Sequence, residues 1–367
     1  MLLVNVDMFS GALYAMDSGA PFVMGWGGAA LAFLRNSLLE SKSAALLAML
    51  FGVGIAIQYD HAEARGVSYL PHAFRRAGAL ALLGLAHTLL LWNFDILLDY
   101  AVISLLVLPF MRLQGGRILW AIPALLVITV LVALPVMAQS ARPDRAAEAF
   151  TMAQRYYAHG TWLEALRFRA WEFVHVAGPQ RLANRLPILS PFFILGVYFW
   201  RKGLFAEPQS HVPTLRRLFV WCFVLGLVAN LIPQDRLHEA VAHLGFRPLR
   251  VLIKAIAFFA RPALTIGYAS GLLLLMQAPA GRRVLGVLAP LGRTTLSQYL
   301  LQSVVFTLVF NGYGLGLFGL VPMNACILGG VAFFALQVWA SHAWLARFRT
   351  GPVEWLWRRM TYTTTQA

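Results

Sequence analysis

The chain has 367 residues, of which 59% are hydrophobic and only 12% are charged, and its formal net charge is +15. A soluble domain carries about twice that share of charged residues, so the composition excludes an ordinary soluble protein. The mean hydropathy is +0.68, and apolar runs of about 20 residues, the length that crosses a bilayer, recur along the chain. The sequence therefore predicts an all-α fold, a polytopic transmembrane helical bundle. It does not show the alternation of apolar and polar residues that a β-barrel needs.

The apolar runs predict about ten membrane segments. In chain order these are 1–16, 43–59, 73–92, 95–111, 117–139, 187–203, 215–233, 248–277, 290–311 and 322–346. Most positive charge falls in alternate connections and in the C-terminal tail, which predicts that both termini are cytoplasmic. The excess of positive charge is thereby explained by orientation in a membrane, and no nucleic-acid partner is expected.

This pattern divides the chain into three parts. Residues 1–139 carry membrane helices one to five, and residues 187–367 carry helices six to ten with a cytoplasmic tail. Residues 140–186 are expected to form an extracytoplasmic amphipathic connection, in which glutamates balance part of the arginine charge. Sixteen helical residues rise only about 24 Å, so the first helix is expected to be truncated, with further residues upstream.

Three ionisable side chains interrupt the apolar stretch "GLAHTLLLWNFDILLDYAV": His87, Asp95 and Asp99. Asp95 has the alternative role of capping the next helix, and His87 that of a hydrogen bond to a neighbouring helix. Asp99 lies within a predicted membrane helix, where ionisable groups usually face a cavity or a partner. A histidine beside a carboxylate is a common general base, so these three are the candidate catalytic residues.

Two sets of basic residues are candidate substrate-binding groups. Arg75 and Arg76 stand at the expected cytoplasmic end of the helix that carries His87, where arginine forks suit phosphate groups. The alternative is positive-inside orientation or binding of anionic lipid. Arg250, Lys254 and Arg261, at offsets of four and seven residues, share one helix face and are expected to line a polar cavity.

Gln298, Tyr299 and Gln302 form a polar stripe on another predicted helix. Hydrogen bonding between helices is one role for them, and lining the path of a substrate is the other. The cysteines, Cys222 and Cys326, lie in apolar segments, so neither a disulfide nor a metal site is expected.

Four stretches resemble a known family of bacterial inner-membrane proteins. They are "ESKSAALLAMLFGVGIAIQ", "RRAGALALLGLAHTLLLWNFDILLDYAV", "LAPLGRTTLSQYLLQS" and "SHAWLARFRTGPVEWLWRRMTY". They are similar to motifs of the YeiB-type family, whose C-terminal half is the domain of unknown function 418. Phe94 stands where the family usually has a glycine, directly before Asp95. The family's opening Leu-Asp-x-x-Arg-Gly motif is absent. The resemblance implies a relation to membrane acyltransferases, with a cytoplasmic acyl-CoA donor and a sugar or glycan acceptor on the outer side.

The leading hypothesis is thus an acyltransferase-like protein of the inner membrane, in contact with membrane lipids. His87 would be the base, oriented by Asp95 or Asp99, and acyl-CoA would enter past Arg75 and Arg76 as a co-substrate rather than a bound cofactor. A transporter of an anionic small molecule, using the face of Arg250, is one alternative. A non-catalytic protein of envelope assembly is another. The acyl group, the acceptor and the oligomeric state stay open.

Overall fold

The computed structural model describes residues 1–12, 14–15, 22–140, 148, 150–233, 237, 239–241 and 247–361, and every regular element in these ranges is helical. The all-α prediction is confirmed for this part of the chain. The α-helices are α1 (Leu2–Phe9), α3 (Gly28–Leu38), α4 (Lys42–Ala64), α5 (Leu70–Leu90), α6 (Leu97–Val107), α7 (Ala121–Ser140), α9 (Trp162–Glu172), α10 (Gly178–Arg201), α11 (Val212–Leu231), α13 (Arg247–Leu275), α14 (Pro279–Arg293), α15 (Thr295–Phe310), α16 (Met323–Leu345) and α17 (Pro352–Thr361). Short turns of 3-10 helix, η1 (Leu108–Arg112), η2 (Gly115–Trp120) and η5 (Pro208–His211), and of π-helix, η3 (Gln154–Ala158) and η4 (Phe173–Ala177), join some of them.

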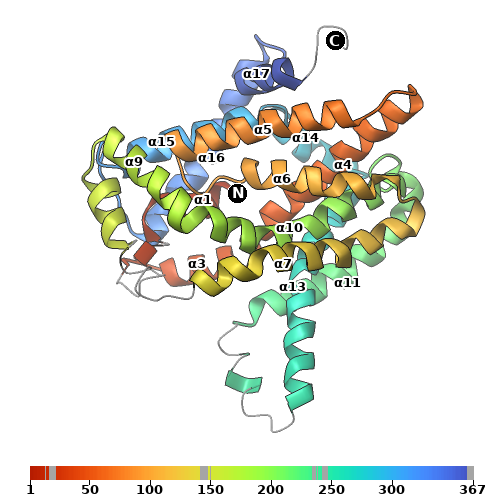
Figure 1. Ribbon diagram of the computed structural model, residues 1–367, viewed down its shortest axis with the longest axis horizontal. Helices are drawn as coiled ribbons and strands as arrows, with labels where there is room; N and C mark the ends of the chain where they lie inside the picture. Colours follow the sequence, from red (N-terminus) through yellow and green to blue (C-terminus); the bar gives the residue numbers. More distant parts are fainter. Residues whose placement is uncertain are drawn as a thin grey trace.

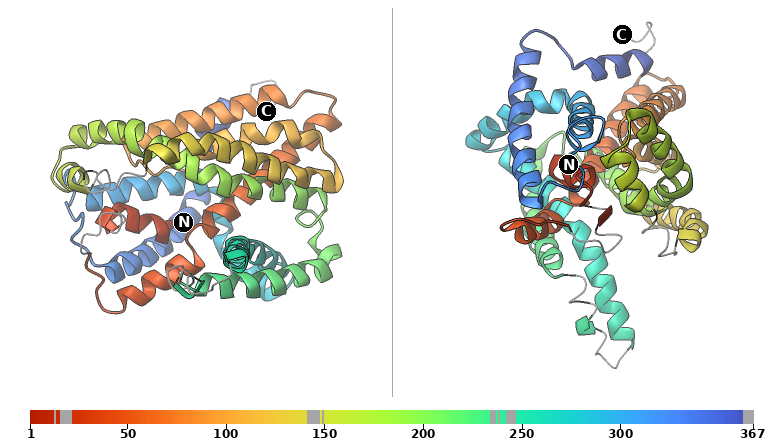
Figure 2. Two further views of the ribbon diagram at one scale, coloured as in Figure 1. Left: turned by 60° about the horizontal axis from the view of Figure 1, so that its bottom comes forward. Right: turned by 90° about the vertical axis from the view of Figure 1, so that its left-hand side faces the viewer.

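The helices α5, α6, α7, α10 and α11 run in the same general direction, whereas α13 crosses that direction and projects from the rest (Figures 1 and 2). The connections that join α4 to α5, α6 to α7 and α10 to α11 gather at one end of the bundle (Figure 1). Arg201 of α10 binds the connection between α6 and α7 at this end, because its guanidinium donates hydrogen bonds of 2.7 Å to the carbonyls of Met111 and Leu113. The turn between α5 and α6 lies at the opposite end, together with α9.

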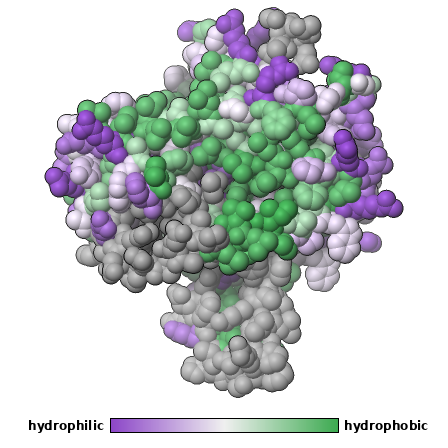
Figure 3. Space-filling model, in the orientation of Figure 1, coloured by the Kyte–Doolittle hydropathy of each residue, from purple (hydrophilic) through white to green (hydrophobic). Residues whose placement is uncertain are grey.

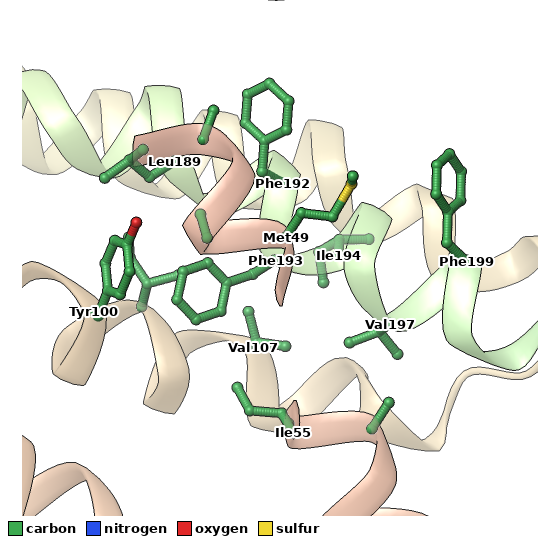
Figure 4. Packing of buried hydrophobic residues seen from close by; sticks show 14 of the residues in the cluster. Met49, Ile55, Tyr100, Val107, Leu189, Phe192, Phe193, Ile194, Val197 and Phe199 are labelled. Carbon is green, nitrogen blue, oxygen red and sulfur yellow. The ribbon is translucent and has the colours of Figure 1, made fainter. Parts of the chain in front are cut away.

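The main core lies between α4, α6 and α10. Met49 and Ile55 of α4, Tyr100 and Val107 of α6, and Phe193 of α10 meet there, each at most 1% exposed (Figure 4). Apolar side chains packed this closely gain van der Waals contact, which also holds helices together inside a bilayer.

Two glycines allow α4 and α10 to approach this closely. A Cβ at Gly52 would lie 2.0 Å from the carbonyl oxygen of Phe193, and a Cβ at Gly196 would lie 2.0 Å from that of Met49. Each glycine therefore faces the backbone of the other helix. Small residues at crossings of this kind are typical of packed membrane helices.

Apolar residues cover the middle of the face seen in Figure 3, and hydrophilic residues gather toward its two ends. Exposed apolar side chains of α7 contribute to this surface: Val127, Ile128, Val130, Leu131, Val132 and Leu134. A broad apolar surface between polar ends indicates a membrane protein.

The prediction of about ten membrane segments is not supported. Among the described residues, four stretches are long and apolar enough to cross a bilayer: Gly28–Ala64, Gly115–Val132, Pro208–Leu231 and Met323–Leu345. A fifth results if Ala260–Leu275 and Pro279–Arg293, which are bent by 110° at the break between them, count as one span.

Several predicted segments are shorter or differently bounded than expected. The helix α1 has 8 residues and α6 has 11, well short of the roughly 20 needed to span a bilayer. The predicted segment 290–311 is divided, because α14 ends at Arg293 and α15 begins at Thr295. Hydropathy alone could not separate apolar helices that span from short ones that pack inside the bundle.

Candidate functional site

His87, in the last turn of α5, forms a buried pair with Asp95. Its Nδ1 lies 2.8 Å from Asp95 Oδ1, and the two residues are 2% and 0% exposed. Leu91 and Trp92 both donate their backbone N–H groups to the carbonyl of His87, which ends the helix and turns the chain toward α6. The pairing predicted between these two residues is therefore present in the geometry.

Asp95 also performs its alternative role, because its second carboxylate oxygen, Oδ2, accepts the backbone N–H of Leu98 at 2.9 Å. Capping the first turn of α6 in this way fixes the orientation of the carboxylate. Tyr299 of α15 donates its hydroxyl to Asp95 Oδ1 at 3.2 Å, and its ring centroid lies 5.0 Å from that of His87. This contact joins α15 to the turn before α6, which is the hydrogen-bonding role proposed for Tyr299, and its substrate-lining role stays a prediction.

Ser303 of α15 completes the cluster, and sequence reasoning missed it. Its Oγ lies 2.7 Å from His87 Nε2, and the residue is 1% exposed. Ser303 follows Gln302 directly and lies one helical turn beyond Tyr299, so the polar stripe on this helix was the available signal. The separation of 216 residues from His87 hid the contact.

The alternative partner of His87, Asp99, binds Arg185 instead. Asp99 Oδ2 lies 3.0 Å from Arg185 Nη1, and the carboxylate side chain is 1% exposed. Arg185 belongs to the first half of α10, a helix that begins at Gly178, earlier than the expected start at residue 187. Of the two carboxylates proposed to orient His87, Asp95 is the one in hydrogen-bond contact.

A second buried cluster lies beside the turn between α5 and α6. Glu172 of α9 accepts hydrogen bonds from Tyr14 at 2.8 Å, Asn93 at 2.8 Å and Tyr157 at 3.0 Å. Burial, followed by the charge of Glu172, raises the pKa of Tyr157 well above its ordinary value. Glu172, which lies in the arginine-rich segment 140–186, is therefore held by hydrogen bonds from three neutral side chains.

Arg169 of α9 and Trp92 also reinforce this end of the bundle. Arg169, 0% exposed, donates hydrogen bonds of 2.9 Å and 3.0 Å to the carbonyls of Leu89 and Leu90. Trp92 is 2% exposed and stacks on Phe9 with ring centroids 4.0 Å apart. The connection predicted over 140–186 thus packs directly on the turn that carries the site.

Arg75 and Arg76, adjacent in sequence, have different surroundings. Arg75 is exposed and donates to the carbonyl of Pro71 within its own helix. Arg76 is 9% exposed and donates to Gln58 Oε1 at 3.0 Å. Its guanidinium also lies over the rings of Phe51 and Trp357 at 5.4 and 5.5 Å. The guanidinium groups of Arg75 and Arg76 therefore do not lie side by side on one exposed surface.

The basic face on α13 is described only in part. Arg261 donates a 3.0 Å hydrogen bond to the carbonyl of Ile232, while the side chains of Arg250 and Lys254 lie outside the described residues. The carboxylate of Asp7, on α1, contacts Arg35 of α3. The expected polar cavity on this face accordingly stays a prediction.

Gln298 and Gln302 make hydrogen bonds between helices. Gln302 donates to Gln337 Oε1 at 2.9 Å, and Gln337 donates to Gln298 Oε1 at 2.9 Å. Gln298 in turn donates to Ser341 Oγ at 3.0 Å. These bonds tie α15 to α16, and α15 is the helix that carries Tyr299 and Ser303.

A pocket of about 440 Å³ opens at the end of the bundle away from His87. Its lining residues come from the end of α4, from the α6–α7 connection and from the end of α10: Tyr59, Asp60, Glu63, Met111, Arg112, Gln114, Gly115 and Arg201. The lining combines carboxylates with arginines. In the described ranges no group of three or more His, Cys, Asp or Glu side chains is placed to hold a metal ion.

These features define an all-helical protein with several helices that are apolar and long enough to cross a membrane. A family model described as "Protein of unknown function (DUF418)" matches residues 199–364, which include both C-terminal motifs. YxaH of Bacillus subtilis (strain 168), an uncharacterized protein, is 29% identical over 366 residues, which is 92% of this chain and 83% of YxaH. The uncharacterized YeiB of Escherichia coli (strain K12) is 28% identical over 341 residues, 88% of this chain and 82% of YeiB. The family-model match and the two relatives support assignment of the chain to the YeiB/DUF418 family. No solved structure matches it significantly.

Proposed function

We propose that the protein is a membrane acyltransferase in which His87 is the general base. The observation that carries this proposal is the buried pair of His87 and Asp95, in which the second imidazole nitrogen, Nε2, lies 2.7 Å from a hydroxyl oxygen. A carboxylate on Nδ1 fixes the tautomer in which Nε2 accepts a proton, and it stabilises the imidazolium that results. The acceptor would be a hydroxyl or amine, as on a sugar or glycan.

The donor in this proposal is acyl-CoA, which approaches from the end of α5 that carries Arg75. Arg75 is exposed and its guanidinium suits the phosphates of CoA. The eleven residues from Arg76 to His87 correspond to a helical rise of about 16 Å. Since CoA holds its phosphates and its thioester at opposite ends of a long arm, the two ends of α5 match the two ends of the donor.

The test uses purified protein in lipid nanodiscs, with acetyl-CoA and palmitoyl-CoA as donors and a panel of hexoses and hexosamines as acceptors. Release of free CoA measures turnover, and calorimetry measures donor binding. We expect His87→Ala to lower turnover by about 10²–10⁴-fold, the usual cost of losing a general base, with donor affinity nearly unchanged. Arg75→Ala should weaken donor binding in a salt-dependent way.

His87→Gln separates catalysis from packing, because glutamine retains hydrogen-bonding groups and has no basic nitrogen. A folded and fully active His87→Gln protein would overturn the proposal. Counterflow uptake of an organic anion into proteoliposomes, without release of CoA from any donor, would also overturn it and identify a transporter.

A further inference from the structure

We infer that Ser303 is a nucleophile that carries the acyl group as an ester between donor and acceptor. The inference deepens the proposed function and rests on it for the identity of the donor. It assigns a covalent step to a residue of α15 that lies far from His87 in sequence.

The geometry is that of a nucleophile, a base and an orienting carboxylate. Ser303 Oγ lies 2.7 Å from His87 Nε2, and His87 Nδ1 lies 2.8 Å from Asp95 Oδ1. The three residues come from α15, from α5 and from the turn before α6, and none is more than 2% exposed. A triad of this kind is recognised by its geometry and roles rather than by the order of its residues in the chain.

The hydrogen-bond pattern determines where the protons lie. An ionised Asp95 only accepts, so Nδ1 of a neutral His87 carries the ring proton and Nε2 has a free lone pair. The hydroxyl of Ser303 is then the donor across the 2.7 Å contact. Its other acceptor is the carbonyl of Tyr299, at the longer distance of 3.4 Å. Ser303 is thus aimed at a base that can remove its proton.

The surroundings of Asp95 hold this arrangement in place. Its Oδ1 receives the Tyr299 hydroxyl as well as His87 Nδ1, and its Oδ2 receives the N–H of Leu98. These hydrogen bonds hold the carboxylate in the orientation that faces the imidazole.

In the first half-reaction His87 Nε2 takes the proton of Ser303 as Oγ attacks the thioester carbonyl carbon. The C–O bond forms, the C–S bond breaks, and CoA leaves as the thiol after receiving that proton from His87. In the second half-reaction the acceptor hydroxyl gives its proton to His87 and attacks the acyl-serine. The ester bond to Ser303 breaks, and His87 returns the proton to Oγ. No oxidant, reductant or metal is needed.

The experiment has two arms on the same nanodisc preparation. In the first, the protein is treated with a fluorophosphonate–biotin probe. An activated serine attacks this probe at phosphorus with loss of fluoride, and peptide mass spectrometry locates the labelled residue. In the second, [¹⁴C]acetyl-CoA is added without acceptor, the protein is denatured in acid, and the acetylated residue is located. Variants are Ser303→Ala, Ser303→Cys, His87→Ala and, as a matched control, Ser190→Ala, a serine that is equally buried in α10. Thermal unfolding confirms that each variant is folded.

We expect both labels on Ser303, a loss of labelling by more than about 10²-fold in Ser303→Ala and His87→Ala, and no change in Ser190→Ala. Ser303→Cys should yield a thioester that hydroxylamine cleaves, which would show that position 303 carries the acyl group and that the loss in Ser303→Ala does not come from disturbed packing.

If folded Ser303→Ala released CoA at a rate close to that of the wild type, the acyl-serine would be refuted and the proposed function would stand as direct transfer. If the fluorophosphonate labelled Ser303 in a His87-dependent way but no acyl-CoA donated, the nucleophile would stand and the proposed function would fail. Absence of both labels would refute the inference.

Discussion

Arg185 of α10 joins two acidic residues of the α6 region, because its Nη1 lies 3.0 Å from Asp99 Oδ2 and also donates a 3.0 Å hydrogen bond to the carbonyl of Asp95. This arginine therefore ties α10 to the turn that presents Asp95 to His87. The Asp99 side chain is 1% exposed and that of Arg185 is 25% exposed. Removing one partner of such a pair leaves a buried charge without its counter-ion.

The first prediction is that Arg185→Gln destabilises the protein by about 3–5 kcal/mol, the usual cost of breaking a buried ion pair from one side. The double variant with Asp99→Asn should lose less than the sum of the single losses, because no charge is then left uncompensated. Unfolding in detergent measures all three. Asp60→Asn is the control, since that carboxylate is 39% exposed and lies 3.9 Å from Arg201. It should cost less than about 1 kcal/mol. Additive effects of Arg185→Gln and Asp99→Asn would contradict the prediction.

The second prediction concerns the crossing of α4 and α10. Gly52→Ala and Gly196→Ala should each sharply reduce the yield of folded protein, because the new Cβ would lie 2.0 Å from a backbone oxygen of the facing helix. Backbone in a packed crossing cannot move aside cheaply. Size-exclusion chromatography and thermal unfolding in detergent provide the measurement.

Gly78→Ala, in α5, is the matched control for this series, since nothing lies within 4 Å of a Cβ built there. Alanine in a helix interior is favoured over glycine by about 1 kcal/mol. This variant should be neutral or more stable than the wild type. Equal effects of the three substitutions would show that α4 and α10 are not in contact as described.

The third prediction concerns sidedness. In a background in which Cys222 and Cys326 are replaced by alanine, single cysteines are placed at Gly66, Arg167 and Glu207, all of which are exposed. A membrane-impermeant maleimide added to intact cells should label only position 167. Positions 66 and 207 should react after permeabilisation, because their connections carry the arginines expected inside. Labelling of all three positions from the same side would contradict this assignment.

The fourth prediction concerns the capping box that starts α9. Thr161 Oγ1 accepts the N–H of Glu164, and the Glu164 carboxylate accepts the N–H of Thr161 at 2.8 Å and its hydroxyl at 2.8 Å. The backbone hydrogen bond to Thr161, followed by that from its side chain, holds the pKa of Glu164 below its usual value of 4.5. Thr161→Ala should weaken the start of α9 by about 1 kcal/mol.

The pH dependence follows from the direction of that shift. Since the folded-state pKa of Glu164 is depressed, its stabilising effect is complete above the unfolded value and is lost as the pH falls through the folded value. Deuterium exchange of the first turn of α9 in Glu164→Ala, compared with wild type at the same pH, should therefore be faster at about pH 7. The two should converge toward about pH 3. A difference that does not change with pH would contradict the role of the ionised carboxylate.

Local spacing made part of the site predictable from sequence. His87 and Asp95 are eight residues apart across a helix end and a turn, so a contact between them needs only local geometry, and the capping position of Asp95 follows from the same turn. The apolar runs of the sequence likewise predicted helices with apolar surfaces. These helices form the apolar surface seen in Figure 3.

Tertiary packing decided the rest. Ser303 lies 216 residues from His87, and Arg185 lies 86 residues from Asp99, so neither contact has a periodic signature in the chain. Among the described residues the structure has four or five candidate spans, fewer than the ten that hydropathy predicted. Hydropathy shows that a segment is apolar, but it does not show whether lipid or protein covers that segment. The sequence by itself determined which residues prefer to leave water. Only the packing of α15 and α10 against the turn between α5 and α6 determined which polar groups meet there, because a buried polar group takes whatever partner its neighbouring helices present.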